Sequence, residues 1–393
     1  MTPFQKYVRG PLCFPNQSLW KAYEGESAMK KLRTGSLLFT FWLSLTSVIY
    51  SQESEERVSE GTLHELLGGI EERTSFHGFA DIQFRFEDPS EGEERSFFTL
   101  GQLDFFPTAQ LTDHISFLNE TIVRAATGEQ QIFSVERLII KYAIRDSFNL
   151  ALGRFHTALG YWNEAYHHGA WLQTTIDRPE IMTFNAILPI HSVGVELSGI
   201  LDFPTFDLSY VANFANGRGI TPAQVQIFSD ANNDKAYAFK LSLRPKGLPG
   251  LALGPTIYYD VIPPDISTPP KFGETTELIL GGHLVYLTKR FEFLAEYFNI
   301  HHDEEISSKT FDTNGFYIQT AYQKGKLKPY YRFDFVDIGK GDPFFSSFID
   351  IKRHTVGLRY DVATFNALKL EYAWQDTDVT SANLILFQSA FAF

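Results

Sequence analysis

NLILFQSAFAF, residues 383–393, gives the first indication of the fold. Its side chains alternate, so that large apolar residues fall on one face of an extended chain while Leu, Gln and Ala fall on the other. The first face carries Ile385, Phe387, Phe391 and Phe393. This alternation predicts a β-strand that ends on an aromatic side chain. The last strand of a soluble sheet can have the same pattern, so other parts of the chain must decide between a soluble sheet and a membrane barrel.

A second signal lies near the other end of the chain. Met29 is followed by a basic run (30–33) and by an uncharged, mainly apolar stretch (35–50). This stretch is shorter than the roughly 20 apolar residues that a spanning helix needs, and it ends before the small Ser51. The pattern predicts a secretory signal peptide over 29–51, with a single N-terminal anchor helix as the alternative.

The residues before Met29 show neither periodicity nor the composition of a targeting signal. Residues 24–26 (EGE) can be encoded by a purine-rich, ribosome-recruiting run, so we interpret 1–28 as a mis-assigned start region. This region contains Cys13, the only cysteine. Without it the chain has no cysteine, which is typical of an envelope protein that folds without disulfides, and we expect no lipoprotein anchor.

Residues 52–75 form a charged segment between the signal and the first strand. Leu63, Leu66 and Ile70 fall at helical spacing behind Thr62 and Glu65, which make a capping-box pair. We expect a periplasmic lead-in with a short amphipathic helix that tucks into a barrel or helps subunits to associate. A solvated linker is the alternative.

Residues 76–393 alternate between strands and turns. In the first predicted strand Phe84 and Phe86 face one way, whereas Gln83 and Arg85 face the other. A membrane barrel turns the apolar face to lipid and lines a wet lumen with the polar one, whereas a soluble sandwich buries the apolar face. The predicted strands, strong and weak, are 76–86, 97–105, 115–123, 137–144, 149–155, 192–201, 206–214, 237–243, 251–261, 276–286, 291–297, 316–322, 327–335, 356–362, 368–375 and 383–393.

The connections between these strands alternate in length. Short turns occur at 145–146, 288–289, 324–326 and 364–366, and long polar loops at 88–94, 127–131, 217–234, 263–273, 301–314 and 339–349. Short periplasmic turns and long extracellular loops are typical of outer-membrane barrels. The sequence therefore predicts an all-β fold, a transmembrane antiparallel β-barrel of about 16 strands. The formal net charge of −13 makes nucleic acid an unexpected partner.

Several stretches resemble the phosphate-selective porin O and P family of the outer membrane. They are 153–160 (GRFHTALG), 187–189 (ILP), 194–199 (GVELSG), 216–217 (NG) and 232–236 (NNDKA). The resemblance covers roughly a quarter of the chain after Ser51. It implies a 16-stranded, trimeric porin whose third long loop folds into the channel. His156 stands where the family has Lys and Ala158 where it has Pro, so we do not infer phosphate selectivity.

The long segment 156–189 contains the candidate constriction residues. A loop folded inside a barrel narrows the lumen, and opposed charges there select solutes by size and charge. The candidates are Arg154, His156, Asp177, Arg178 and Glu180, facing lumen-wall residues Arg85, Arg137, Lys141, Glu196, Arg332 and Arg359. An external loop with solvated charges is the alternative.

We expect no metal site, no cofactor and no catalysis. His156, His167, His168 and His191 cluster in sequence, but their spacing matches no tetrahedral template. Ser192 beside His191 lacks any G-x-S-x-G context, so an outer-membrane esterase or protease is the least favoured reading.

The sequence thus favours an integral outer-membrane porin of a Gram-negative bacterium for passive diffusion of small hydrophilic solutes or ions. We expect a homotrimer in outer-membrane lipid, assembled by barrel-assembly machinery that reads the strand ending in Phe393. An adhesin or structural barrel with a closed lumen is the alternative.

Overall fold

The computed structural model describes residues 73–125, 131–167, 169–183, 187–226 and 229–393. The predicted start region (1–28), the signal peptide (29–51) and the amphipathic helix of the lead-in lie outside the described residues, and the predictions for them stay predictions. Residues 74–393 contain the predicted barrel.

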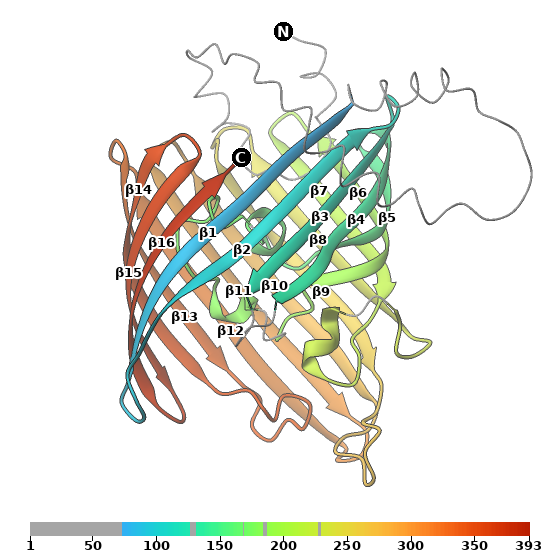
Figure 1. The fold of residues 1–393 in the computed structure, drawn as a ribbon. Coiled ribbons are helices and arrows are strands. Elements are labelled where there is room, and N and C mark those ends of the chain that lie inside the picture. The colour runs from blue at the N-terminus through green and yellow to red at the C-terminus, as the bar shows by residue number, and fades with distance from the viewer. Residues whose placement is uncertain (1–72, 126–130, 168, 184–186, 227–228) are drawn as a thin grey trace, which may run out of the picture. The chain divides into compact units, whose positions relative to one another are not determined.

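Sixteen antiparallel strands in the described part of the chain close into one barrel (Figure 1). Each strand pairs with its neighbours in sequence, and β1 pairs with β16. The strands are β1 (Thr74–Pro89), β2 (Arg95–Gln110), β3 (Ile115–Ala125), β4 (Gln131–Arg145), β5 (Phe148–His156), β6 (His191–Asp202), β7 (Phe206–Asn216), β8 (Lys235–Pro245), β9 (Leu251–Ile262), β10 (Thr275–Leu287), β11 (Phe291–Glu304), β12 (Lys309–Tyr322), β13 (Leu327–Asp337), β14 (Ile351–Ala363), β15 (Asn366–Thr377) and β16 (Ser381–Ala392). Every predicted strand overlaps one of them, so the predicted fold class and strand number are confirmed.

The last strand closes the barrel against the first. Phe387 lies opposite Phe84 in the register, and the backbone of Phe393 exchanges two hydrogen bonds with Gly78, at 2.8 and 3.0 Å. The C-terminal residue is therefore part of the seam. Closure removes the unpaired edges that an open sheet would expose.

The two faces of the strands divide as the sequence predicts. On β16, Phe387 is 41% exposed on the outside while Leu386 is fully buried on the inside. Large apolar side chains remain exposed on the outer face of many strands, among them Phe98, Leu138 and Leu370. Ionisable side chains such as Asp104 and Glu371 are buried inside. A soluble sandwich would bury the apolar face, so this arrangement excludes it.

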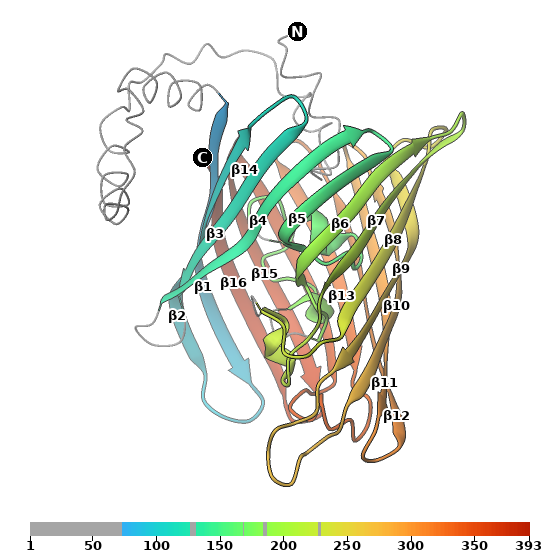
Figure 2. The ribbon, with the colours of Figure 1, turned by 90° about the vertical axis from the view of Figure 1, so that its right-hand side faces the viewer.

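The connections differ between the two ends of the barrel (Figures 1 and 2). At one end the connections have only a few residues, as at 146–147 and 246–250. The other end carries the long connections 217–234, 263–274 and 338–350. The predicted long loop at 301–314 is wrong, because β11 and β12 extend beyond the predicted spans and leave only 305–308 between them. The described residues include no helix long and apolar enough to cross a membrane.

Candidate functional site in the barrel lumen

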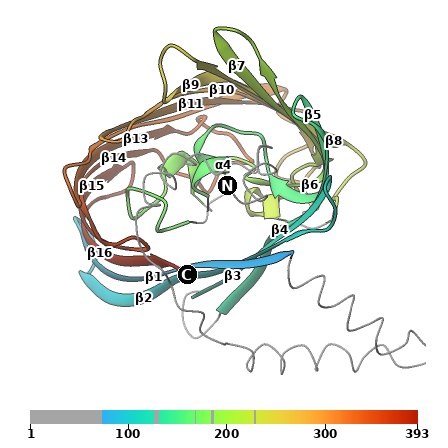
Figure 3. The same ribbon diagram turned by 90° about the horizontal axis from the view of Figure 1, so that it is seen from above.

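The connection between β5 and β6 spans 157–190, and its described residues (157–167, 169–183 and 187–190) lie inside the barrel (Figure 3). We call it the β5–β6 loop. It contains α4 (Trp162–Ala165) and the 3-10 turn η3 (Glu180–Met182). Its apolar side chains, Trp162 and Ile181 among them, are buried in one cluster with wall residues such as Phe298 of β11. This burial holds the loop against one side of the lumen.

Acidic wall residues hold the loop by its backbone amides. Glu296 of β11 accepts hydrogen bonds from the amides of Tyr161 and Trp162, at 2.6 and 2.8 Å. Glu371 of β15 accepts one from Ile176 at 2.6 Å. Bonds from backbone amides to carboxylates are stronger than bonds between neutral groups, so these contacts fix the loop in one position.

Basic wall residues hold the loop by its carbonyl oxygens. Arg332 of β13 donates to the carbonyls of Asp177 and Arg178, at 2.8 and 2.9 Å. Arg359 of β14 donates to the carbonyls of Trp171 and Gln173 at 2.7 and 2.9 Å. The structure thus places Arg332 and Arg359, two of the four predicted lumen-wall arginines, inside the barrel with their guanidinium groups bound to the loop backbone.

Two loop carboxylates pair with arginines of the wall. Asp177 lies between Arg85 of β1, at 2.9 Å, and Arg353 of β14, at 2.7 Å. Arg353 also reaches Glu180 at 2.8 Å. Burial by itself would raise the pKa of Asp177, but Arg85 and Arg353 outweigh it and hold the pKa well below its usual range. The Asp177 carboxylate is therefore charged at any pH near neutrality.

A cavity of about 460 Å³ remains between the loop and the wall formed by β14, β15, β16, β1, β2 and β3. Of the sequence candidates, Arg85, Asp177, Arg178 and Glu180 line it. The inner surface of this part of the wall adds further polar side chains, including Asp81, Gln102, Arg124 and Gln388. The cavity is polar and charged, unlike a pocket for an apolar ligand.

The remaining sequence candidates do not line this cavity. Arg154 is buried at the end of β5, where it donates to the Glu136 carbonyl at 3.0 Å and lies 3.8 Å from the Glu136 carboxylate. His156 is buried against the rings of His167 and His191. Three imidazoles in contact form the group in the described residues that could hold a metal ion. Lys141 and Glu196 belong to the β4–β6 wall, outside the cavity.

Arg137 shows how a local irregularity changes the lining. The register of β3 and β4 shifts between Glu120 and Thr121, which marks a β-bulge. As a result the side chains of the consecutive residues Glu136 and Arg137 both contact groups inside the barrel. Arg137 pairs with Glu120 at 2.5 Å. Strict alternation assigns Glu136 to the outer face, so sequence reasoning missed it.

Arg353 was also missed, although a signal for it exists in the sequence. It has the same parity as Arg359, so it faces inward on the same strand. The predicted strand began at Val356, whereas β14 begins at Ile351. Extending the alternation by a few residues toward the N-terminus would have included Arg353.

Solved structures with the same architecture are outer-membrane proteins. An anion-selective porin from Comamonas acidovorans aligns at a TM-score of 0.58 with 11% identity, covering 81% of this chain and 99% of that one. The fold is that of the outer-membrane porins. The trimer form of OmpT, an outer membrane protein of Vibrio cholerae, aligns at 0.55 with 11% identity, covering 82% of this chain and 100% of that one. The outer membrane channel DcaP of Acinetobacter baumannii aligns at 0.53 with 10% identity, covering 81% and 97%.

The porin fold is recognised from the structure alone, because comparisons of the sequence find no match. No protein-family model matches the chain, and no curated protein matches it. The solved porins do not single out the phosphate-selective porin O and P family among porins.

Proposed function

We propose that the protein is an integral outer-membrane porin of a Gram-negative bacterium, through which small hydrophilic solutes or ions diffuse passively. The observation that carries the proposal is the charged cavity between the β5–β6 loop and the wall formed by β14–β16 and β1–β3. A loop that is bound to one side of a barrel leaves a passage along the other side. Solutes crossing it pass Arg85, Asp177, Arg178 and Glu180, which form the constriction.

The exterior of the barrel supports the proposed location. Its outward face exposes aromatic and aliphatic side chains, as lipid contact requires. Diffusion needs no bound cofactor and no chemical step, so we propose no enzymatic activity. Charged lining residues of both signs, such as Arg353 and Glu180, favour weak selectivity over a strong preference for anions or cations.

Assembly and partners belong to the same proposal. We propose a homotrimer, since one of the structurally similar proteins is known in a trimer form. The C-terminal strand, whose last residue Phe393 lies in the seam, would be the segment that barrel-assembly machinery reads. Resemblance of 153–160 and 194–199 to the phosphate-selective porin O and P family supports a relationship, with a solute class that His156 and Ala158 leave open.

Single-channel conductance in a planar bilayer tests the function. We expect stable current steps, in groups of three for a trimer, and a small reversal potential under a salt gradient. Heat-modifiable mobility on a denaturing gel would show that the inserted protein is a folded barrel. Folded, inserted protein that passes no current would contradict the porin proposal and support a structural or adhesive barrel with a closed lumen.

A further inference from the structure

Three histidines from separate parts of the chain meet at the base of the β5–β6 loop. His156 ends β5, His191 begins β6, and His167 follows α4 within the loop. The first two lie directly opposite each other in the strand register, so their side chains share one face. The loop folds back and brings His167 onto that face, which no spacing in the sequence reveals.

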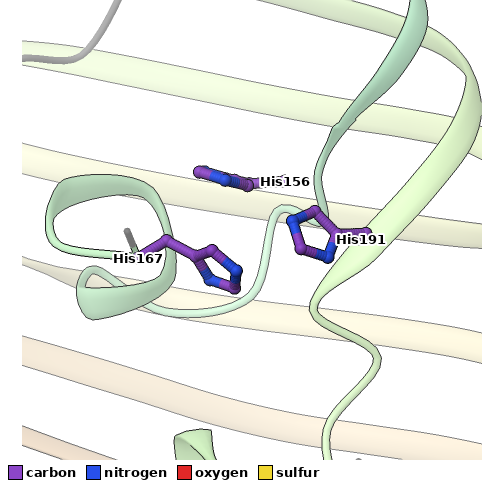
Figure 4. A group of neighbouring side chains, drawn as sticks. All are labelled: His156, His167 and His191. Atoms are coloured by element: carbon purple, nitrogen blue, oxygen red, sulfur yellow. The ribbon is translucent and has the colours of Figure 1, made fainter. Parts of the chain in front are cut away.

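The three imidazole rings lie beside one another inside the barrel (Figure 4). Their ring centroids lie 4.4, 4.5 and 5.2 Å apart. One ring nitrogen of each residue lies within 4.8 Å of those of the other two. All three residues are buried. Nitrogens that bind one metal ion tetrahedrally at about 2.0 Å lie roughly 3.3 Å apart, so the side chains must move closer together by up to about 1.5 Å to bind it.

The tautomer of His167 is set by its neighbour Asn163. The Asn163 amide nitrogen donates to the carbonyls of Thr157 and Ile190, both at 3.0 Å. Its Oδ1 atom is therefore the group that faces His167 Nδ1, at 2.8 Å, and it accepts a hydrogen bond. His167 thus carries its proton on Nδ1 and keeps the lone pair on Nε2. Ligand histidines in metal sites are commonly oriented by such a second hydrogen bond.

Charges around the cluster determine which ion it can hold. The Glu136 carboxylate lies 3.2 Å from His191 Nε2 and brings one negative charge to the site. Arg154 lies 3.8 Å from the same carboxylate, and Arg178 donates to the backbone carbonyl of His167. The two arginines oppose a cation, so a hard ion held only by charge, such as Ca²⁺ or Mg²⁺, does not fit. An ion that bonds strongly to imidazole does.

We propose that His156, His167 and His191 form a structural binding site for a first-row divalent cation of the zinc class, with Glu136 or water as a fourth ligand. The ion joins the end of β5, the start of β6 and the segment after α4. The ion therefore links the two ends of the β5–β6 loop to the segment that follows α4 within the loop. None of the three histidines lines the cavity, although Arg178, which does, donates to the His167 carbonyl. The proposed site does not depend on the proposed diffusion function, since metal binding can be measured without transport.

Metal binding by the detergent-purified protein, stripped with a chelator, tests the proposal. We expect one Zn²⁺ per chain, and with Co²⁺ the visible absorption bands of a four-coordinate site. The His167→Gln and His156→Gln variants should each bind more weakly by at least about 100-fold. Asn163→Ala leaves the three histidines in place but removes the orienting bond to His167 and the two bonds to the Thr157 and Ile190 carbonyls. It should lose about 10- to 100-fold.

His283→Gln is the matched control, because His283 is also buried on the inner wall but contacts Ser242, at 3.3 Å, outside the cluster. It should bind as the parent does. Heat-modifiable gel mobility identifies variants that remain folded barrels, and either histidine variant suffices if the other does not fold. A folded parent protein that takes up no Zn²⁺ or Co²⁺ would overturn the site. So would unchanged binding in a folded His156→Gln or His167→Gln variant.

Discussion

Arg85 and Asp177 form a two-bond ion pair across the lumen, with Nη1 to Oδ1 at 2.9 Å and Nη2 to Oδ2 at 3.0 Å. Arg85 belongs to β1 and Asp177 to the β5–β6 loop, which also binds β11, β13, β14 and β15. Ile176 of the loop shares an apolar cluster with Leu384 of β16, and together with this packing the pair joins the loop to the wall that lines the cavity. It restricts the cavity and contributes a charge of each sign to it.

Replacing Arg85 by Gln should widen the passage and make its lining more negative. We expect a higher single-channel conductance, by roughly 1.2- to 2-fold, and a reversal potential shifted toward cation preference, since opposed charges at a constriction govern selectivity. Arg145→Gln removes the same charge from an exposed strand end, outside the cavity. An equal shift in both variants would show that the Arg85 position has no special role.

The pH dependence of this contact follows from the lowered pKa of Asp177. The folded protein lowers the pKa of the Asp177 carboxylate below the value of the unfolded chain. The ion pair is therefore fully formed above the unfolded-state pKa, and it is lost only as the pH falls through the lower pKa of the folded state. We therefore expect the difference in reversal potential between the parent protein and Asp177→Asn to stay constant from pH 7 to about pH 4. A difference that has fallen to about half near pH 4 would mean that Asp177 titrates with the ordinary pKa of an aspartate.

Much of the fold could be predicted because the alternation of side chains along a barrel strand shows which face meets lipid and which meets the lumen. The alternation of Phe84 and Arg85 continues through sixteen strands, and the closing strand up to Phe393 shows the same period. Prediction failed where the alternation is broken or where both faces of a strand become polar. The bulge in β4 turns Glu136 inward, although strict alternation places it on the outer face. β11 and β12 are longer than predicted, so most residues of the predicted 301–314 loop belong to these strands.

The candidate site was less predictable, because it depends on where a long loop folds. Asp177, Arg178 and Glu180 can be picked out as charges in an unusually long connection, but their partners come from distant strands. Arg332 looks like a lumen charge from its strand parity, whereas the structure uses it to hold loop carbonyls. The contact of His167 with His156 and His191 likewise requires the three-dimensional path of the loop.

Arg332 should be required to keep the loop in place. It is fully buried, donates to the Asp177 carbonyl, and pairs with Asp334 at 2.8 Å. Arg332→Met leaves the Asp334 carboxylate without its cation, and loss of one partner of a buried pair costs about 3–5 kcal/mol. We expect a lower urea midpoint of unfolding and a noisier channel with frequent substates.

The double variant Arg332→Met/Asp334→Asn separates the buried charge from the loop contacts. Removing both charges should restore part of the unfolding midpoint while the channel stays noisy, since the loop carbonyls still lack their donor. Lys246→Gln, which removes an exposed ion pair with Asp207, should leave both measurements unchanged. A quiet Arg332→Met channel would contradict the anchoring role.

Gly153 should be indispensable for joining β4 to β5 just before the loop. Its φ of +135° is a conformation that residues with a Cβ rarely adopt, and a Cβ there would lie 1.9 Å from the Leu138 carbonyl oxygen. Backbone strain of this kind costs about 1–3 kcal/mol, and the clash with a paired strand adds to it. Gly153→Ala should therefore lower both the folded fraction after refolding and the urea midpoint of unfolding.

Gly247, in the turn after β8, provides the control, because a Cβ there would meet nothing within 4 Å. Gly247→Ala should stay within about 0.5 kcal/mol of the parent, and equal losses in the two variants would refute the packing argument.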